Sequence, residues 1–415
     1  MGKKVIVIGG GIIGLCAAYF LQKEGHNVTI VDRSSLNSGA SYVNAGYLSP
    51  SHVIPLSAPG VMRKGIKWMF NPSSPLYIKP RLDLDFLKWA LAFDKSSNTK
   101  HVEKSALVIR DITVLSQKLY EDISTSESFT AQYEKKGLMM LCQTDMALSE
   151  ELNMAKMVID LGLEAKEINK FDIKELEPDV NINAIGGIFY KCDHHSTPNE
   201  FMKEMKSYLK KVGVTFLTNE KVMDLSFDRA TITSIQTNKQ NLVADEFVLA
   251  AGSWSALLSK KIGLKLLLQA GKGYCINTKQ PTGITLPAIL AEAKAAVTPM
   301  NGFTRFAGTM EIAGINHNIN RKRVDAIANA VNRYFPQIEV SKNEKEDAAC
   351  GLRPVSPDGL PYIGKSSKCN NLTIATGHAM MGWSMGTATG LLVSEIISNK
   401  KTSLGLNPFH PDRKF

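Results

Sequence analysis

The first 32 residues constrain the fold of this chain most strongly. An apolar run over residues 5–8 leads into Gly9-Gly10-Gly11-Ile12-Ile13-Gly14, and Asp32 follows 18 positions after the last of these glycines. In a dinucleotide-binding βαβ unit, the first glycine permits a tight turn, the second lets the backbone approach a pyrophosphate, and the third lets the helix pack closely on the strand. Residues 12–24 are helix-like and residues 27–31 predict a second strand, after which Asp32 is placed to accept a hydrogen bond from a ribose hydroxyl. We therefore predict a nucleotide site at the N-terminus of this helix.

The same stretch also resembles a targeting signal, because Lys3 and Lys4 precede an apolar run over residues 5–21. Cleavage there would remove the glycine fingerprint and leave Asp32 without a role, so we favour the nucleotide-binding interpretation. No other stretch is apolar enough to predict a membrane-spanning helix.

The composition is that of an ordinary globular protein. With 415 residues, 44% of them hydrophobic and 21% charged, the chain favours two domains. The six cysteines are scattered without a CxxC pair or metal-ligand spacing, so we expect a reduced cytoplasmic protein with no disulfide and no bound metal. The net charge of +10 raises the question of nucleic acid or an anionic membrane, but no basic run supports nucleic acid.

One segment suits a membrane surface. Residues 58–70 mix cations such as Lys67 with Trp68, Met69 and Phe70. This composition is typical of an interfacial helix or loop on anionic lipid. The alternative is that the aromatic side chains pack inside while the lysines are solvated.

The remaining pattern predicts alternating helices and strands without repeats or a low-complexity linker. We expect helices at 86–93, 105–123, 146–161 and 199–211, and strands at 137–142, at 186–190 and repeatedly within 214–249. A second signature spans residues 246–255, where an apolar strand breaks at Gly252 and restarts as a helix. Flavoproteins of the glutathione-reductase-like fold use such a returning strand to complete the cofactor domain. A plain strand-to-helix turn explains the local pattern as well.

A third signature lies near the C-terminus. Residues 351–364 read GLRPVSPDGLPYIG, followed by LTIATGH at 372–378 and a predicted helix at 382–397. In this order, the motifs resemble the D-amino-acid oxidase and glycine oxidase superfamily, most closely the bacterial D-amino acid dehydrogenases. Asn44-Ala45-Gly46, the pieces around Gly60 and Trp68, and Lys272-Gly273-Tyr274 echo the same pattern.

The resemblance implies an α/β fold in which a glutathione-reductase-like FAD-binding domain is interleaved with an α+β substrate domain on a mostly antiparallel sheet. We assign residues 1–52, 194–258 and 345–415 to the FAD-binding domain, and residues 53–193 and 259–344 to the substrate domain. FAD is expected to be noncovalent, because Val43 stands where some relatives carry the histidine that attaches flavin.

The resemblance also implies a set of cofactor-binding residues. The N-terminus of the helix predicted after Gly377 would face the isoalloxazine ring of FAD, with Gly382 and Trp383 as the main contacts. The complete set is Gly9, Gly11, Ile12, Ile13, Gly14, Asp32, Arg33, Ser41, Asn44, Ala45, Gly46, Val222, Ala251, Gly252, Trp254, Gly377, Gly382, Trp383, Ser384 and Met385.

For the substrate, Arg353 matches the arginine that fixes the carboxylate in the oxidases. A guanidinium fork binds a carboxylate bidentately, which supports that role independently, although a structural salt bridge is the alternative. Tyr274 is a candidate hydroxyl donor, with a core tyrosine as the alternative. Arg305 is a weaker candidate, since a cation on a solvated strand face explains it as well. We expect His378 to position the site without acting as a base.

His194 and His195 point to opposite faces of an extended segment, so joint metal ligation is not expected, although one of them could shape the pocket.

The resemblance implies oxidative deamination of D-amino acids, by hydride transfer from Cα to flavin N5. The resemblance implies a quinone or other electron-transfer acceptor, with peripheral contact at the inner face of an anionic membrane. Three alternatives stay open: an oxygen-using amine oxidase resembling glycine oxidase, a dehydrogenase of D-proline or hydroxy-D-proline, and a flavin-binding membrane-associated protein with vestigial activity.

Overall fold

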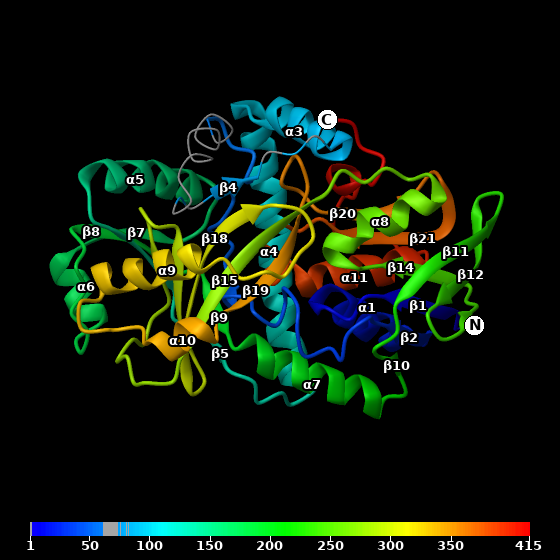
Figure 1. The fold of residues 1–415 in the computed structure, drawn as a ribbon, viewed down its shortest axis with the longest axis horizontal. Helices are drawn as coiled ribbons and strands as arrows, with labels where there is room; N and C mark the ends of the chain where they lie inside the picture. Colours follow the sequence, from blue (N-terminus) through cyan, green and yellow to red (C-terminus); the bar gives the residue numbers. More distant parts are fainter. Residues whose placement is uncertain (1, 61–73, 75, 80, 82) are drawn as a thin grey trace.

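The computed structural model describes residues 2–60, 74, 76–79, 81 and 83–415. Two sheets lie side by side along the longest axis, each with its own helices (Figure 1). The basic aromatic segment falls mostly on residues 61–70, which lie outside the described residues, so its membrane prediction is not addressed by the fold.

The first sheet carries the N-terminal fingerprint. Its strand order is β10 (Thr215–Leu217), β2 (Asn27–Val31), β1 (Lys4–Ile8), β14 (Glu246–Leu249), β21 (Cys369–Thr376) and β20 (Tyr362–Ser366). All neighbouring pairs are parallel except β20 with β21. The predicted returning strand is therefore β14, and it pairs directly with β1. The stretch that resembles a targeting signal forms β1 and the helix after it.

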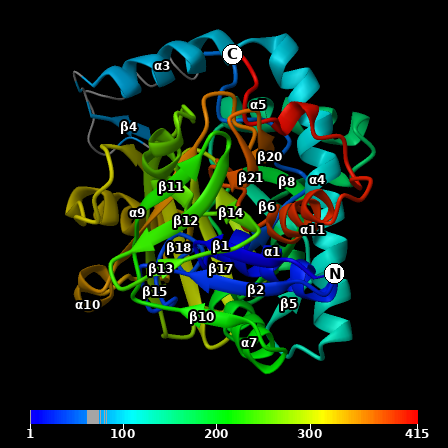
Figure 2. The ribbon, with the colours of Figure 1, turned by 90° about the vertical axis from the view of Figure 1, so that its right-hand side faces the viewer.

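Helices cover one face of this sheet and a small sheet covers the other (Figure 2). The helical face holds α1 (Ile12–Lys23), α4 (Thr99–Ser126), α7 (Pro198–Lys211) and α11 (Gly386–Ile397). Gly390 lets α11 approach α1, because a Cβ atom there would lie 2.5 Å from the carbonyl carbon of Cys16. The opposite face holds β11 (Val222–Asp228), β12 (Thr231–Thr237), β13 (Asn241–Leu242), η1 (Gly252–Trp254), α8 (Ser255–Ser259) and η2 (Lys260–Ile262).

The second sheet has nine strands and is mostly antiparallel. Its main order is β19 (Ala349–Val355), β15 (Gln269–Thr278), β18 (Phe303–Ile312), β17 (Ala295–Met300), β16 (Ala288–Leu290), β6 (Leu138–Cys142), β8 (Gly186–Tyr190) and β7 (Ala165–Asn169), with β4 (Leu76–Ile78) beside β18. Helix α9 (Arg321–Tyr334) packs on one face through the core that contains Val324 and Ile327, and α10 (Lys342–Glu346) follows it. Helices α5 (Asp145–Asp160) and α6 (Lys170–Leu176) complete this half of the molecule.

Three further elements complete the fold. They are the small sheet of β3 (Tyr47–Leu48), β9 (His194–Ser196) and β5 (Tyr133–Glu134), helix α3 (Leu84–Ser96), and η3 (Asn407–Phe409). In the described part of the chain, no helix is long and apolar enough to cross a membrane.

The predicted fold class is confirmed: a mostly parallel sheet that carries the glycine fingerprint is interleaved in sequence with a mostly antiparallel one. The helices predicted at 86–93 and 105–123 lie inside α3 and α4. Those predicted at 146–161 and 199–211 match the ends of α5 and α7 to within one residue. The predicted helix from residue 382 begins at Gly386, because residues 380–385 form turns. Our domain boundaries remain a prediction, and β19 lies in the nine-stranded sheet although its residues fall in the range assigned to FAD binding.

Candidate active site

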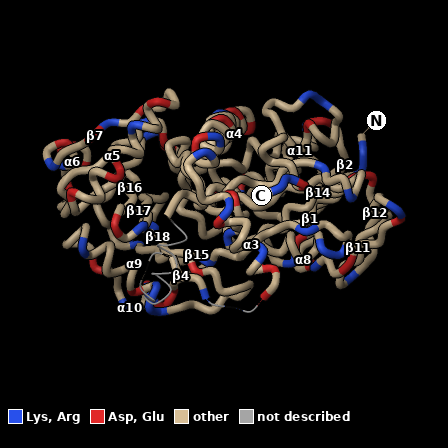
Figure 3. Tube along the Cα trace, turned by 90° about the horizontal axis from the view of Figure 1, so that it is seen from above, with Lys and Arg blue, Asp and Glu red and all other residues tan. Residues whose placement is uncertain are grey.

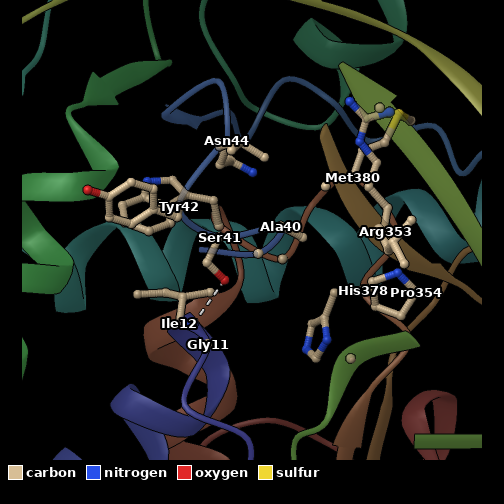
Figure 4. A pocket seen from close by; sticks show the side chains of 18 of the residues that line it. Gly11, Ile12, Ala40, Ser41, Tyr42, Asn44, Arg353, Pro354, His378 and Met380 are labelled. Atoms are coloured by element: carbon tan, nitrogen blue, oxygen red, sulfur yellow. Dashed lines mark hydrogen bonds between the residues drawn. The ribbon is translucent and has the colours of Figure 1, made fainter. Parts of the chain in front are cut away.

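One cavity of about 1030 Å³ connects the two sheets. It runs from the N-terminus of α1, past the segment at residues 37–45, to β19 and the turn at residues 378–384. Figure 4 shows Ser41, Tyr42 and Asn44 on one side of this cavity, and Arg353, His378 and Met380 on the other.

The glycine fingerprint has the close contacts that its pattern predicts. A Cβ atom at Gly14 would lie 1.8 Å from the carbonyl oxygen of Gly9, which itself has a φ of +109°. Gly11 precedes α1 and has no side chain with which to cap the helix, and the positive end of the helix dipole, at Gly11, Ile12 and Ile13, lines the cavity. The Ser41 hydroxyl accepts a hydrogen bond of 3.0 Å from the N–H of Ile12 (Figure 4). This end of the cavity suits an anion such as a pyrophosphate.

Asp32 lines the cavity at the end of β2 and stiffens the loops around it. Its carboxylate accepts hydrogen bonds from the Gly10 N–H at 2.7 Å and from the Ser34 N–H at 2.7 Å and hydroxyl at 2.6 Å. Next to it, the Arg33 guanidinium stacks on the Trp254 ring, 4.0 Å from the ring centroid. These contacts pre-form the walls of a nucleotide site.

The turn before α11 brings a second set of backbone groups to the cavity. Trp383 is buried, and its indole N–H donates to the Ser196 hydroxyl at 3.0 Å. The Ser384 hydroxyl donates to the carbonyl oxygen of Tyr47 at 2.8 Å. Both residues are thus fixed from two directions, and the N-terminal end of α11 stands next to the cavity.

Arg305 does not lie on a solvated strand face, which corrects one of the two interpretations given above. It is 1% exposed and lines the cavity. Its guanidinium donates to the carbonyl oxygens of Tyr42 at 3.2 Å and Asn44 at 2.6 Å. Arg305 therefore holds the segment that carries several predicted cofactor contacts.

Arg353 places its guanidinium over Gly273 of the neighbouring strand. A Cβ atom at Gly273 would lie 2.2 Å from the guanidinium carbon, so a larger residue here would displace this side chain. One N–H group donates to the carbonyl oxygen of Thr309 at 2.9 Å. Burial lowers the pKa of Arg353 to about 10, which leaves it charged at neutral pH, and no acidic side chain in the described part of the chain balances the charge. The remaining donors suit a carboxylate ligand.

Tyr274 faces the opposite side of β15. Its hydroxyl donates to Glu311 at 2.7 Å, and the same carboxylate lies 3.3 Å from Lys272 Nζ and 3.5 Å from Arg323 Nε. Because side chains alternate along a strand, this buried cluster lies behind the sheet from Arg353. The Tyr274 hydroxyl is thus committed to Glu311 and is not available to a substrate in the cavity.

His378 lines the cavity, and its Nε2 lies 3.0 Å from the Thr389 hydroxyl. Burial lowers the pKa of His378 to about 3, so the ring is uncharged at neutral pH. His194 and His195 are not among the residues that line the cavity. His194 instead lies 2.9 Å from the hydroxyl of Tyr133.

The cavity gathers most of the predicted site residues. The ones that line it are Gly9, Gly11, Ile12, Ile13, Asp32, Arg33, Ser41, Asn44, Ala45, Val222, Ala251, Gly252, Trp254, Tyr274, Arg353, His378, Gly382, Trp383 and Ser384. Four predicted residues lie behind the lining: Gly14, Gly46, Gly377 and Met385. Gly14 acts through close packing, and Gly46 and Gly377 have φ values of +81° and +87° that favour glycine.

Sequence reasoning missed several residues that shape the cavity. Thr309, Lys294 and Ala379 line it with φ values of +57°, +49° and +47°, a strained conformation for residues other than glycine. Thr309 combines this strain with the carbonyl that holds Arg353. No signal in a single sequence indicates a positive φ at a threonine or an alanine.

The cavity fits FAD. It combines the N-terminus of α1 for phosphates, a carboxylate at the end of β2, and the turn at residues 378–384 that leads into α11, all along one continuous space. The walls between these groups are largely apolar, as a flavin ring requires.

Known proteins place the chain in a family. Residues 4–396 match the family described as DAO, FAD dependent oxidoreductase. A D-amino acid dehydrogenase of Vibrio atlanticus is 30% identical over 412 residues, covering 97% of each chain, and one of Helicobacter pylori is 30% identical over 400 residues, covering 95% of each. Among solved structures, glycine oxidase from Geobacillus kaustophilus has the same fold, with a TM-score of 0.79 and 21% identity over 100% of this chain and 99% of that one. L-proline dehydrogenase from P. horikoshii is similar, with a TM-score of 0.75 and 19% identity over 99% and 97%. This chain therefore belongs to the DAO family of FAD-dependent oxidoreductases and is an FAD enzyme.

Proposed function

We propose that this enzyme oxidises D-amino acids to 2-oxo acids and ammonia and passes the electrons to a quinone or another non-oxygen acceptor. The observation that carries the proposal is the Arg353 guanidinium, which faces the FAD cavity without an acidic partner among the described residues. The relatives named D-amino acid dehydrogenase, which match nearly the whole chain, support the choice of substrate class.

FAD, when bound, accepts the hydride that leaves the Cα atom of the substrate amine. The residues of this chain have to bind, orient and shield the substrate. Arg353 holds the carboxylate, and the Thr309 carbonyl fixes the guanidinium for that task. The imino acid product then reacts with water to give the 2-oxo acid and ammonia.

No side chain is assigned as a general base. His378 is neutral because burial lowers its pKa to about 3, so it contributes position and shape. The substrate amine must itself be neutral before hydride leaves Cα, and the apolar walls of the cavity favour that neutral form.

For the cofactor, we propose that the α1 N-terminus and Ser41 hold the pyrophosphate and that Asp32 binds the ribose. Val43 lines the cavity where a histidine would be needed for covalent attachment, which supports noncovalent FAD. Denaturation followed by filtration tests this, since released yellow colour supports it and colour retained on the protein contradicts it.

A product assay tests the reaction. D-alanine is mixed with the holoenzyme and either a redox dye or dissolved oxygen, and pyruvate and ammonia are measured. The proposal predicts both products with the dye, and little hydrogen peroxide with oxygen alone. Rapid peroxide formation would instead support the oxygen-using alternative. A D-proline and hydroxy-D-proline series in the same assay tests the secondary-amine alternative.

We further propose that the enzyme works at the cytoplasmic face of an anionic membrane. Helix α3 supports this, because Leu84, Leu87 and Leu91 are 73%, 44% and 73% exposed on one side of it, next to exposed Lys88. Basic and acidic residues are interspersed over the rest of the molecule (Figure 3), so this contact relies on leucines as well as charge.

Sedimentation with liposomes tests the membrane contact. The enzyme should co-sediment with anionic vesicles at low salt and much less at high salt, because salt screens the lysines. Replacing the three leucines with serine should weaken binding to the same vesicles. Equal sedimentation with neutral vesicles would contradict the electrostatic part, and an unaffected triple variant would exclude α3.

A further inference from the structure

The cavity continues beyond Arg353 across the nine-stranded sheet. Strand register places five residues in one row on the cavity side: Cys275 pairs with Ala307, Ala307 with Ala296, Ala296 with Ile289, and Ile289 with Met140. All five line the cavity. The row crosses four inter-strand spacings, about 19 Å in all. This row is longer than is needed to contact the carboxylate and the amine of an amino acid.

An ion pair between α5 and the turn before β17 also lines the cavity. Glu151 of α5 accepts from Lys294 Nζ at 3.1 Å, and both residues line the cavity. The two partners differ in burial, since the Glu151 side chain is 8% exposed and that of Lys294 is 54% exposed. The carboxylate is therefore fixed in the protein, whereas the ammonium can withdraw into solvent.

The distance between Lys294 and Arg353 matches the length of a long amino acid side chain. It directly precedes Ala295, which pairs with Gly308, and Arg353 donates to the next residue of that strand, Thr309. The guanidinium lies over β15, and β17 is two inter-strand spacings away, about 10 Å. A ligand with a carboxylate on Arg353 and a four- or five-atom side chain would span this gap.

The charges that line the cavity distinguish Glu151. Three acidic residues line it in the described part of the chain: Asp32, Glu151 and Glu220. Asp32 and Glu220 belong to the nucleotide end, where the Glu220 N–H donates to the carbonyl oxygen of Asp32. Glu151 is thus the acidic group on the substrate side, next to the apolar surface of Met140 and Met154.

We infer that Glu151 determines specificity, and that it selects D-amino acids whose side chain ends in a cation, such as D-lysine or D-arginine. The inference rests on the proposed function. The substrate cation replaces Lys294 on the buried carboxylate, and the methylene groups of its side chain lie along the row of small and apolar residues. Lys294 keeps Glu151 paired when the cavity holds no such substrate.

The test compares D-lysine with D-norleucine, which has nearly the same length but no charge. Anaerobic flavin reduction gives the efficiency for each substrate with wild-type enzyme and with Glu151→Gln. Wild type should prefer D-lysine, and Glu151→Gln should reduce that preference by about tenfold to a hundredfold, because one charged hydrogen bond is lost. An unchanged ratio between the two substrates would overturn the inference.

Lys294→Met is the matched control. It removes the competing cation, so D-lysine should be oxidised at least as efficiently as by wild type, even if Glu151→Gln fails to bind FAD. Loss of D-lysine oxidation in Lys294→Met would contradict the inference. A second contradicting result combines two observations: Lys294→Met loses oxidation of D-glutamate, and Glu151→Gln leaves oxidation of D-lysine unaffected. That pattern would mean that Lys294 binds an anionic side chain. If none of D-lysine, D-norleucine and D-alanine reduces the wild-type flavin, the proposed function fails. Reduction by D-norleucine with no role for Glu151 contradicts only this inference.

Discussion

Replacing Arg353 with methionine removes the guanidinium but keeps a side chain of similar length over Gly273. The wild-type group donates once to the Thr309 carbonyl and has no acidic partner in the described residues, so its other donors are available to a substrate carboxylate. Loss of one partner from a buried charged pair costs about 2–5 kcal/mol. This corresponds to a rise in substrate Kd of about 30-fold to several thousand-fold.

Anaerobic stopped-flow reduction of the flavin measures this Kd separately from the rate of hydride transfer. Arg353→Lys is the matched comparison: it keeps the charge but lacks the planar fork, so its Kd should fall between those of wild type and Arg353→Met. The FAD content of all three proteins should be equal. An unchanged Kd in Arg353→Met, with FAD bound, would refute the role of this arginine.

Three further predictions follow from other parts of the cavity. Gly273→Ala should raise the substrate Kd about tenfold or more, because the added methyl group displaces the Arg353 guanidinium. Gly405→Ala is the control, since its Cβ atom would meet nothing within 4 Å and its substrate Kd should not change. Equal Kd values for the two variants in stopped-flow reduction would contradict the packing argument. Asp32→Ala should weaken FAD binding about tenfold or more, because it removes acceptors for the Gly10 and Ser34 N–H groups, and a flavin fluorescence titration that shows wild-type affinity would exclude this. Burial lowers the pKa of four histidines from 6.5 to about 4 or 3: His52, His194, His195 and His378. The unfolded chain therefore binds more protons than the folded chain between pH 6.5 and 4, so the free energy of unfolding should fall as pH falls through this window. Asp193 opposes this trend, because burial raises its pKa to about 6. Urea denaturation at several pH values measures the free energy of unfolding, and a flat profile would contradict the predicted sign.

Local patterns made much of the fold predictable. The fingerprint from Gly9 to Asp32 specifies a turn, a helix and a strand within one short stretch, so the sequence predicts it without long-range information. The Gly-Leu-Arg-Pro motif also indicated Arg353, which lines the cavity, while its role there stays a prediction. The pattern did not reveal why Gly273 is glycine, since that reason lies on the neighbouring strand.

Side-chain direction was less predictable in the nine-stranded sheet. Strands β15 and β18 are buried on both faces along nearly all their length, so they have no alternation of polar and apolar residues to separate the cavity face from the core face. For this reason the sequence could not show that Tyr274 faces Glu311, nor that Arg305 is buried. Glu151 and Lys294 are 143 positions apart, and a single sequence gives no sign that they meet.

The most direct test of the account is the colour of the flavin under anaerobic conditions. The purified enzyme is mixed with D-alanine and, separately, with L-alanine, and the visible flavin band is followed. The account predicts that the D-enantiomer bleaches the band and that the L-enantiomer does not. A yellow protein that no D-amino acid reduces would contradict the assignment of substrate, and equal bleaching by both enantiomers would contradict the selectivity for D-amino acids.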